Sequence, residues 1–313
     1  GKAREQQRSL QKLQKFANDV DNAVFNAMGQ AIAKHLPVQG DLFPFDILLI
    51  GGDDILIVVP AAKALQVAHT LAETFQEYTR QMARTLAETF QEDTHREYTL
   101  SVGVVLAPVK YPFRLQQELA DEVLKAAKKA GSSHQMFQEE QNAQETETNK
   151  NGKADPSYVN FLVVTGSTSL TYKDIYRNLH RKHLPYGNKD EFYATMRPYT
   201  LDSLDKLLKY LKAGHDKHLG QTKLHQLREA ILKLNRTTTI LESLVSLRNW
   251  KKDEQQFIED FLRAWDERPE QEKRSEMIFP WIHKSNENAI YRTPLLDFIE
   301  LYDFVTTEGG INA

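Results

Sequence analysis

The 313-residue chain contains no cysteine. This excludes disulfides, thiolate-ligated zinc sites and cysteine nucleophiles. Neither sign of charge is in excess, because 40 Lys and Arg residues stand against 43 Asp and Glu residues, for a net charge of −3. The balance gives no global electrostatic case for binding nucleic acid or a membrane surface. The sequence also lacks an apolar run near the roughly 20 residues that span a bilayer. It lacks a secretory signal peptide as well, so we expect a cytoplasmic protein.

The most informative stretch is Phe45–Pro60, FDILLIGGDDILIVVP. Two short apolar runs flank Gly51-Gly52-Asp53-Asp54, which predicts a β-hairpin with turn-forming residues at its tip. The two glycines allow a sharp turn and let a ligand approach the backbone closely. The adjacent carboxylates of Asp53 and Asp54 repel each other and add nothing to a turn, whereas carboxylate oxygens suit Mg²⁺. One interpretation is therefore a metal site for phosphoryl or nucleotidyl transfer, and the other is an ordinary Gly/Asp turn.

Helices and strands alternate around this hairpin. Apolar residues three to four positions apart predict long amphipathic helices, and short aliphatic runs predict buried strands. The second helix contains a local repeat, Ala68–Tyr78 and Ala83–Asp93, whose 15-residue offset keeps both copies on nearly the same face. We predict helices over Ser9–Leu36 and from Pro60 through this repeat, a strand over Tyr98–Ala107, a helix over Arg114–Ala130 ending at Gly131, a mobile polar segment over Ser132–Pro156, and a strand over Tyr158–Val164.

The fold class that we predict is α+β. With one further strand ahead of Gly1, residues 1–165 would have the β-α-β-β-α-β order of a ferredoxin-like palm, so we expect the chain to be the C-terminal part of a longer protein. Residues 166–313 show no recognisable strand, which predicts an all-α C-terminal domain. Its expected helices are Leu201–Leu211 with Thr200 as the N-cap, Leu224–Leu234, Leu241–Leu247, Gln256–Trp265 and Thr293–Val305.

The order of these motifs resembles the nucleotide-cyclase-like palm. The GGDD hairpin precedes a helix, a strand with Ser101-Val102-Gly103, and a helix ending ADEVLKAAKKAG at Ala120–Gly131. Diguanylate cyclases share this order. The GGDD form, with Lys110–Pro112 leading into the last helix, looks more like the second palm of the large polymerase-like subunit of type III CRISPR effector complexes. The chain departs from that family by lacking its cysteine zinc module and by beginning after the family's first palm strand, which carries a metal-binding aspartate.

The resemblance implies a nucleotidyltransferase that makes cyclic oligoadenylate second messengers from ATP with Mg²⁺ or Mn²⁺. The partners that it implies are other CRISPR effector subunits and guide or target RNA, and a homo-oligomer is a further option. Two alternatives stay open: a non-catalytic nucleotide-binding or scaffold subunit, and a diguanylate cyclase. The implied site residues are Asp53 and Asp54 as catalytic metal ligands, Gly51, Gly52 and Ser101 beside the nucleotide, and Lys128 at the triphosphate, with Lys125 and Lys129 as alternatives.

Large apolar residues gather near the end of the chain. Most of them should be core, but a few exposed ones would form a surface for a partner subunit or a second copy. The residues concerned are Ile278, Phe279, Trp281, Ile282, Leu295, Leu296, Phe298, Ile299, Tyr302 and Phe304.

Overall fold

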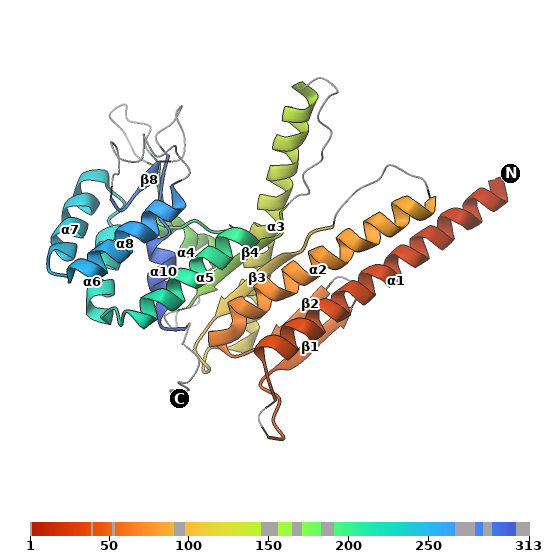
Figure 1. The fold of residues 1–313 in the computed structure, drawn as a ribbon, viewed down its shortest axis with the longest axis horizontal. Coiled ribbons are helices and arrows are strands. Elements are labelled where there is room, and N and C mark those ends of the chain that lie inside the picture. The colour runs from red at the N-terminus through yellow and green to blue at the C-terminus, as the bar shows by residue number, and fades with distance from the viewer. Residues whose placement is uncertain are drawn as a thin grey trace. The chain divides into compact units, whose positions relative to one another are not determined.

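The chain forms two compact units (Figure 1). Unit 1 comprises Gly1–Ala107, Gln116–Leu162 and Pro198–Leu204, and unit 2 comprises Pro108–Leu115, Val163–Arg197 and Asp205–Ala313. No helix in the part of the chain that is described has the length and apolar character needed to cross a membrane. A computed structural model describes residues 2–38, 40–51, 54–90, 98–144, 156–164, 171–182, 191–266, 279–283 and 290–304.

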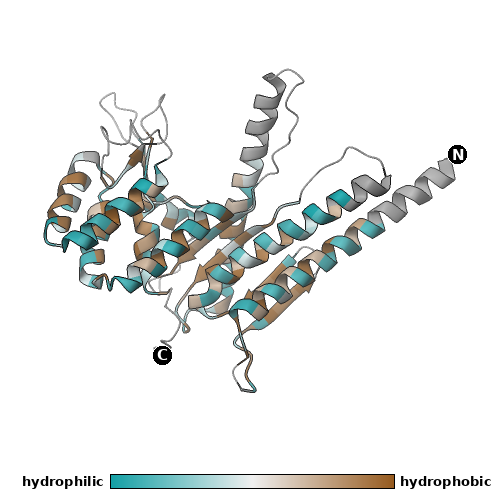
Figure 2. Ribbon diagram, viewed as in Figure 1, coloured by the Kyte–Doolittle hydropathy of each residue, from teal (hydrophilic) through white to brown (hydrophobic). Residues whose placement is uncertain are grey.

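Unit 1 combines three long helices with two small sheets. The antiparallel strands β1 and β2 form one sheet, and the order β3-β4-β7 forms the other. In Figure 2 the hairpin strands are coloured hydrophobic along most of their length, while α1 and α2 mix both colours. The elements are α1 (Lys2–His35), β1 (Asp46–Gly51), β2 (Asp54–Val58), α2 (Ala61–Phe90), β3 (Ser101–Leu106), α3 (Phe113–Gln144), β4 (Tyr158–Val163) and β7 (Tyr199–Thr200).

The hairpin packs on the helix pair α1–α2 through one face. A buried cluster joins Val24 and Ala27 of α1 to Leu71 and Phe75 of α2, and partly buried Ile50 and Ile55 of the hairpin pack against it, among other residues. Small residues such as Ala27 let the two helices approach closely. The burial of these apolar side chains holds the hairpin in place, at roughly 25 cal/mol for each Å² removed from water.

Helix α3 lies very close to strand β3. A Cβ added at Gly103 would stand 2.7 Å from the backbone nitrogen of Leu124 and 2.8 Å from the backbone oxygen of Ala120. No L side chain fits there without movement of the helix, so a packing role explains this glycine. The side-chain amide of Asn160 in β4 donates to the backbone oxygen of Val123, 3.0 Å away, and ties the same helix to the neighbouring strand.

Unit 2 is helical but also contains a four-stranded sheet of order β5-β6-β9-β8. Strands β6 and β9 pair in parallel, and the two outer strands pair antiparallel to them. Helix α5 begins in unit 1 and continues into unit 2. The elements are α4 (Tyr172–Leu179), β5 (His180–Lys182), β6 (Glu191–Tyr193), α5 (Leu201–Asp216), α6 (Gln221–Ile231), α7 (Arg236–Arg248), α8 (Lys252–Trp265), β8 (Ile282–His283), β9 (Ile290–Arg292) and α10 (Leu295–Tyr302).

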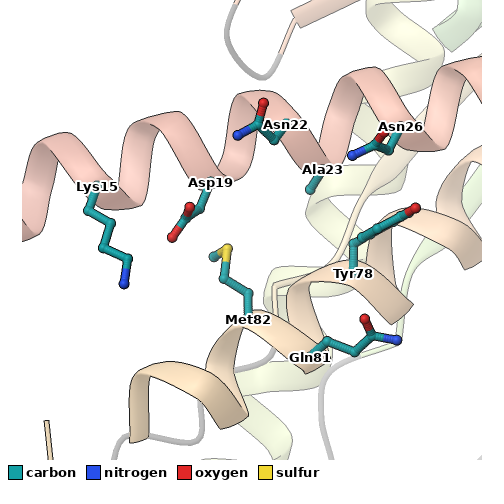
Figure 3. A pocket seen from close by; sticks show the side chains of 8 residues that line it. All are labelled: Lys15, Asp19, Asn22, Ala23, Asn26, Tyr78, Gln81 and Met82. Atoms are coloured by element: carbon teal, nitrogen blue, oxygen red, sulfur yellow. The ribbon is translucent and has the colours of Figure 1, made fainter. Parts of the chain in front are cut away.

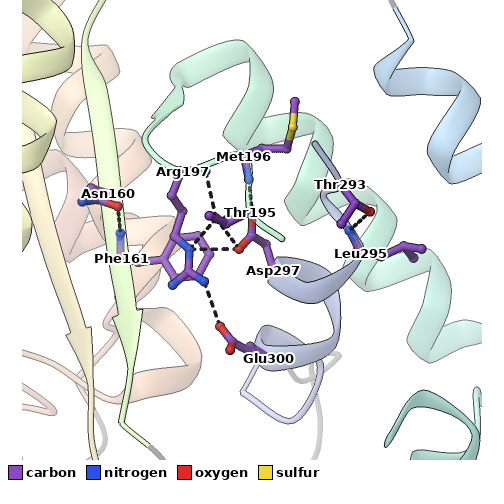
Figure 4. Close-up of polar contacts among 9 residues, drawn as sticks. All are labelled: Asn160, Phe161, Thr195, Met196, Arg197, Thr293, Leu295, Asp297 and Glu300. Carbon is purple, nitrogen blue, oxygen red and sulfur yellow. Dashed lines mark hydrogen bonds and ion pairs between the residues drawn. The ribbon is translucent and has the colours of Figure 1, made fainter. Parts of the chain in front are cut away.

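A buried ionic cluster fixes the segment after β6 to helix α10 (Figure 4). Asp297 is fully buried. Its carboxylate accepts from the Thr195 hydroxyl and the Met196 backbone N–H, both at 2.8 Å, and pairs with Arg197 Nε at 2.9 Å. The same guanidinium reaches Glu300 at 3.0 Å, although burial raises the pKa of that carboxyl. Five polar groups thus satisfy one another inside the unit, as buried charges require.

Two predictions about the fold need correction. Among the described strands, the hairpin and β3 lie in separate sheets, so the ferredoxin-like order, which needs one further strand ahead of Gly1, stays a prediction. Helix α3 does not end at Gly131, as predicted, but continues through it to Gln144. The C-terminal region is not all-α, since it contains β5, β6, β8 and β9. The sequence did not reveal these strands because they are too short to show an alternating pattern.

The remaining element predictions agree well with the structure. Helix α2 runs without a break through the repeat as far as Phe90, and residues 91–93 lie outside the described residues. All five predicted C-terminal helices are present, with bounds shifted by a few residues. The backbone N–H of Ser203 approaches Thr200 Oγ1 at 3.4 Å, as an N-cap would place it. The domain boundary at 165/166 stays a prediction.

Among the residues that the structure describes, the apolar side chains near the end of the chain are buried or half-buried and form no exposed surface. Phe298, Leu295 and Leu296 are fully buried, and Phe298 packs against the rings of Phe257 and Phe261. Of the ten, Phe304 is half-buried, Ile278 lies outside the described residues, and the others are buried. The prediction of a docking surface made from them is therefore wrong.

Candidate functional site

The hairpin has the register that the sequence predicts. Ile50 pairs with Ile55 and Gly51 with Asp54, which leaves a two-residue connection at the tip. Those two residues, Gly52 and Asp53, lie outside the described residues. The structure therefore brings Gly51 and Asp54 together at the end of the hairpin, and both are exposed.

Gly51 is a glycine that the fold does not require. Its backbone is outside the left-handed region, and a Cβ added to it would meet no atom within 4 Å. Gly103 is the opposite case, because a Cβ there would collide with the backbone of α3. The open space at Gly51 leaves the backbone next to Asp54 accessible to a ligand.

Asp54 supplies an exposed carboxylate, but a complete set of metal ligands is not present among the described residues. They contain no group of three or more His, Asp or Glu side chains that could hold an ion. Mg²⁺ in nucleotide sites needs only one or two protein carboxylates, because substrate phosphates and water supply the other oxygens. An exposed carboxylate beside an unobstructed backbone fits that ligand type, with Asp53 as its expected neighbour.

The other two predicted site residues lie outside the hairpin, Ser101 on strand β3 and Lys128 on helix α3. Ser101 is half-buried at the start of β3. That end of the strand is anchored because the backbone N–H of Leu100 donates to Ser157 Oγ at 3.1 Å, and the Thr79 hydroxyl donates to the Tyr98 carbonyl at 2.9 Å. Ser101 thus belongs to a strand of fixed position, in a different sheet from Asp54.

Lys128 projects from α3 on the side away from the core. Val123 and Ala127 of the same helix are fully buried, whereas Lys125, Lys128 and Lys129 are exposed. The exposed position allows Lys128 to meet an anionic ligand, and it does not distinguish Lys128 from the other two lysines. The assignment of the triphosphate contact therefore stays a prediction.

The outer face of the hairpin is apolar and exposed, a feature that the sequence did not reveal. Ile47, Leu48, Leu49 and Val58 each keep 40–50% of their surface accessible. The buried-strand prediction for these residues is therefore only half correct. A regular strand would alternate its faces, but the register shifts between Ile47 and Leu49, so three successive side chains are exposed.

Comparison with known proteins matches the first part of the chain to one family. Residues 2–137 match the model of the Cas10/Cmr2 second palm domain. No curated protein matches the chain significantly. The matched range includes α1, the whole hairpin, α2, β3 and the part of α3 that carries Lys128.

Proposed function

We propose that this chain, whose residues 2–137 match the model of the Cas10/Cmr2 second palm domain, is a nucleotidyltransferase that makes cyclic oligoadenylates from ATP. The proposal places the chain in a CRISPR effector complex with other subunits and with guide or target RNA. The match does not extend to the C-terminal region, so the proposal concerns the palm.

The observation that carries the proposal is the hairpin tip. Gly51 and Asp54 are paired, exposed and unnecessary for packing, while the strands behind them are held by the α1–α2 core. A fold that only needed a turn would gain nothing from a carboxylate pair at Asp53 and Asp54, because like charges repel. A site for a metal-bound triphosphate uses every one of these features.

Each predicted site residue has its own role in binding the metal or the nucleotide. Asp53 and Asp54 would hold Mg²⁺ or Mn²⁺, which lowers the barrier by neutralising charge on the phosphates. Gly51 and Gly52 would let the base or a phosphate lie against the backbone. Lys128 would offset charge on the triphosphate, as a cation does in other phosphoryl-transfer sites.

The reaction that we propose needs no side-chain nucleophile. The 3′-hydroxyl oxygen of one nucleotide attacks the α-phosphorus of the next, a new P–O bond forms, and the bond to pyrophosphate breaks. The hydroxyl proton passes to solvent or to a carboxylate, and ring closure repeats the same exchange at the ends of the oligomer. The absence of cysteine from the chain is therefore no objection.

A non-catalytic scaffold is the second candidate, and one observation favours it. Exposed Ile47, Leu48, Leu49 and Val58 give the outer face of the hairpin the apolar character of an interaction surface. In that case the palm would bind nucleotide or partners without turnover. Turnover and partner binding can also coexist, since the apolar face lies on the strands and the carboxylates lie at the tip.

Incubation with ATP and Mg²⁺ or Mn²⁺, with products separated and weighed by mass spectrometry, tests the proposal. The expected result is pyrophosphate release together with cyclic oligoadenylates from the chain in its effector complex. ATP binding without any turnover would favour the scaffold. Preferred consumption of GTP with a cyclic dinucleotide product would favour a diguanylate cyclase.

A further inference from the structure

A groove of about 300 Å³ opens between α1 and α2 in unit 1 (Figure 3). Gly51 and Asp54, the described residues of the hairpin tip, are not among its lining residues. One wall comes from α1, where Lys15, Asp19, Asn22 and Asn26 follow one another at intervals of three or four positions and so share one helix face with Ala23. The other wall comes from the middle of α2, through Tyr78, Gln81 and Met82.

The groove changes character along its length. Lys15 and Asp19 place opposite charges at one end, and Met82 supplies an apolar surface next to them, opposite Ala23 (Figure 3). Asn26 and the ring of Tyr78 lie at the other end.

Three of the side chains that line the groove are amides. Asn22 and Asn26 come from α1 and Gln81 comes from α2. Each amide carries both a hydrogen-bond donor and an acceptor. Such groups are typical of a site that recognises the edge of a planar polar ligand, whereas a groove that binds a hydrocarbon would not need them.

The walls of the groove are held by the core beneath them. Ala23 is 3% exposed and belongs to the buried α1–α2 cluster. The Tyr78 hydroxyl accepts a hydrogen bond from Gln30 Nε2 at 3.1 Å, which links the two helices beside the groove. The ring and the backbone positions that a ligand would use are therefore in place before it binds.

We propose that this groove binds an adenine nucleotide, with the base between Tyr78 and Met82, the ribose at Asp19 and the phosphate at Lys15. An Asn or Gln amide pairs with the N6 and N7 atoms of adenine through two hydrogen bonds, which guanine cannot match because it presents two acceptors there. A carboxylate is a suitable acceptor for ribose hydroxyls.

The groove is long enough to hold a mononucleotide. Lys15 and Asn26 are 11 residues apart on one helix, or roughly 16 Å at 1.5 Å per residue. Among the described residues that line the groove, Lys15 is the one cation, and its ammonium suits a phosphate group. The site is independent of the palm reaction and does not need a metal.

Calorimetric titration of AMP in the presence of EDTA tests the site without involving a metal-bound triphosphate at the hairpin. We expect saturable binding of one AMP per chain, and GMP binding weaker by about tenfold or more. Asn22→Trp should fill the groove and abolish AMP binding. Asn18→Trp is the matched control, because Asn18 is exposed on the same helix and does not line the groove.

The outcomes separate this site from the palm. Asp54→Ala should leave AMP binding unchanged, and Asn22→Trp should leave ATP turnover by the palm unchanged, provided that both variants melt like the parent. Lack of saturable AMP binding, or equal loss in both Trp variants, would overturn the proposal. Equal affinity for inorganic phosphate or ribose 5-phosphate would also overturn it, because recognition would then not involve the base.

Discussion

Two aspartates in this chain show how differently a carboxylate can serve a fold. Asp297 is fully buried in unit 2 and satisfies a hydroxyl, a backbone N–H and a guanidinium within 3 Å (Figure 4). Asp54 stands exposed at the end of a hairpin in unit 1. The first carboxylate is needed by the structure, and the second is available for a ligand. The GGDD motif marked Asp54 in the sequence, but no local pattern marked Asp297 as a buried ion-pair partner.

The largest effect that we expect is the loss of stability on Asp297→Ala. Removal of this carboxylate takes away the ion pair to Arg197 Nε at 2.9 Å and leaves the Met196 N–H without its acceptor. Breaking a buried pair by removing one partner destabilises by about 3–5 kcal/mol. Thermal unfolding should show a melting temperature lower by at least roughly 6 °C. Asp54→Ala is the control and should not change the melting temperature. Similar shifts in both variants would mean that Asp54 is as important to stability as Asp297.

The exposed lysines of α3 allow the predicted contact with the ATP triphosphate to be tested. Lys128→Ala should weaken ATP binding by about 1.5–3 kcal/mol, or roughly ten- to a hundredfold, and leave the Mg²⁺ dependence in place. Lys125→Ala, an equally exposed neighbour, is the matched control. Calorimetric titration of ATP into the three proteins gives the answer. Should Lys128→Ala bind as tightly as the parent, the contact belongs to Lys125, Lys129 or another cation.

Two glycines repeat the contrast between structure and function. Gly103→Ala should destabilise the protein by about 1–3 kcal/mol, because its Cβ would press on the backbone of α3 at 2.7–2.8 Å. Gly51→Ala has open space around the new methyl group and should unfold like the parent, while ATP binding weakens. Chemical denaturation of both variants measures the difference. A destabilised Gly51→Ala variant would mean that this glycine is structural after all.

Substitution of Glu254 should have the smallest effect on stability, and that effect should depend on pH. Burial alone would raise its pKa, but hydrogen bonds from Lys223 and from the Lys251 N–H outweigh burial and lower it below 4.5. A lowered pKa means that the ionised form stabilises the fold at neutral pH, and that this contribution is lost as pH falls below about 4.5. Glu254→Gln should therefore destabilise by roughly 1–2 kcal/mol at pH 7.

The control for this pH dependence lies on the same helix. Glu259 forms an exposed pair with Arg263 at 3.9 Å, which is worth little, so Glu259→Gln should unfold like the parent at neutral and at low pH. The difference in unfolding free energy between Glu254→Gln and the parent should shrink in urea titrations as the pH is lowered below 4.5. A difference that stays constant with pH would show that the carboxylate charge plays no part.

The sequence predicted those parts of the fold whose signals are long or local. The hairpin strands have five and six residues around a Gly-Asp turn, and its register follows from them. The strands β5, β6, β8 and β9 have two or three residues, which is too few for an alternating pattern. Gly131 looked like a helix end, but a glycine inside a helix costs only about 1 kcal/mol, and α3 continues through it.

The candidate site was predicted less completely than the fold. The exposure of Asp54 and Gly51 agrees with the functional interpretation of GGDD. The pairing of Thr195 and Arg197 with Asp297 joins residues about one hundred positions apart, which no local pattern encodes. The α1–α2 groove was equally hidden, because Asn22 and Asn26 look like ordinary solvent-facing residues of an amphipathic helix until α2 is placed beside them.

One paired measurement tests the central claim that the hairpin tip is a nucleotidyl-transfer site. Asp53→Ala with Asp54→Ala is compared with Asp46→Ala, an exposed carboxylate at the opposite end of the same hairpin, for melting temperature and Mg²⁺-dependent pyrophosphate release from ATP. The account predicts unchanged melting in both proteins, and a loss of at least roughly a hundredfold in release for the double variant alone. Unchanged release by the double variant would contradict the account.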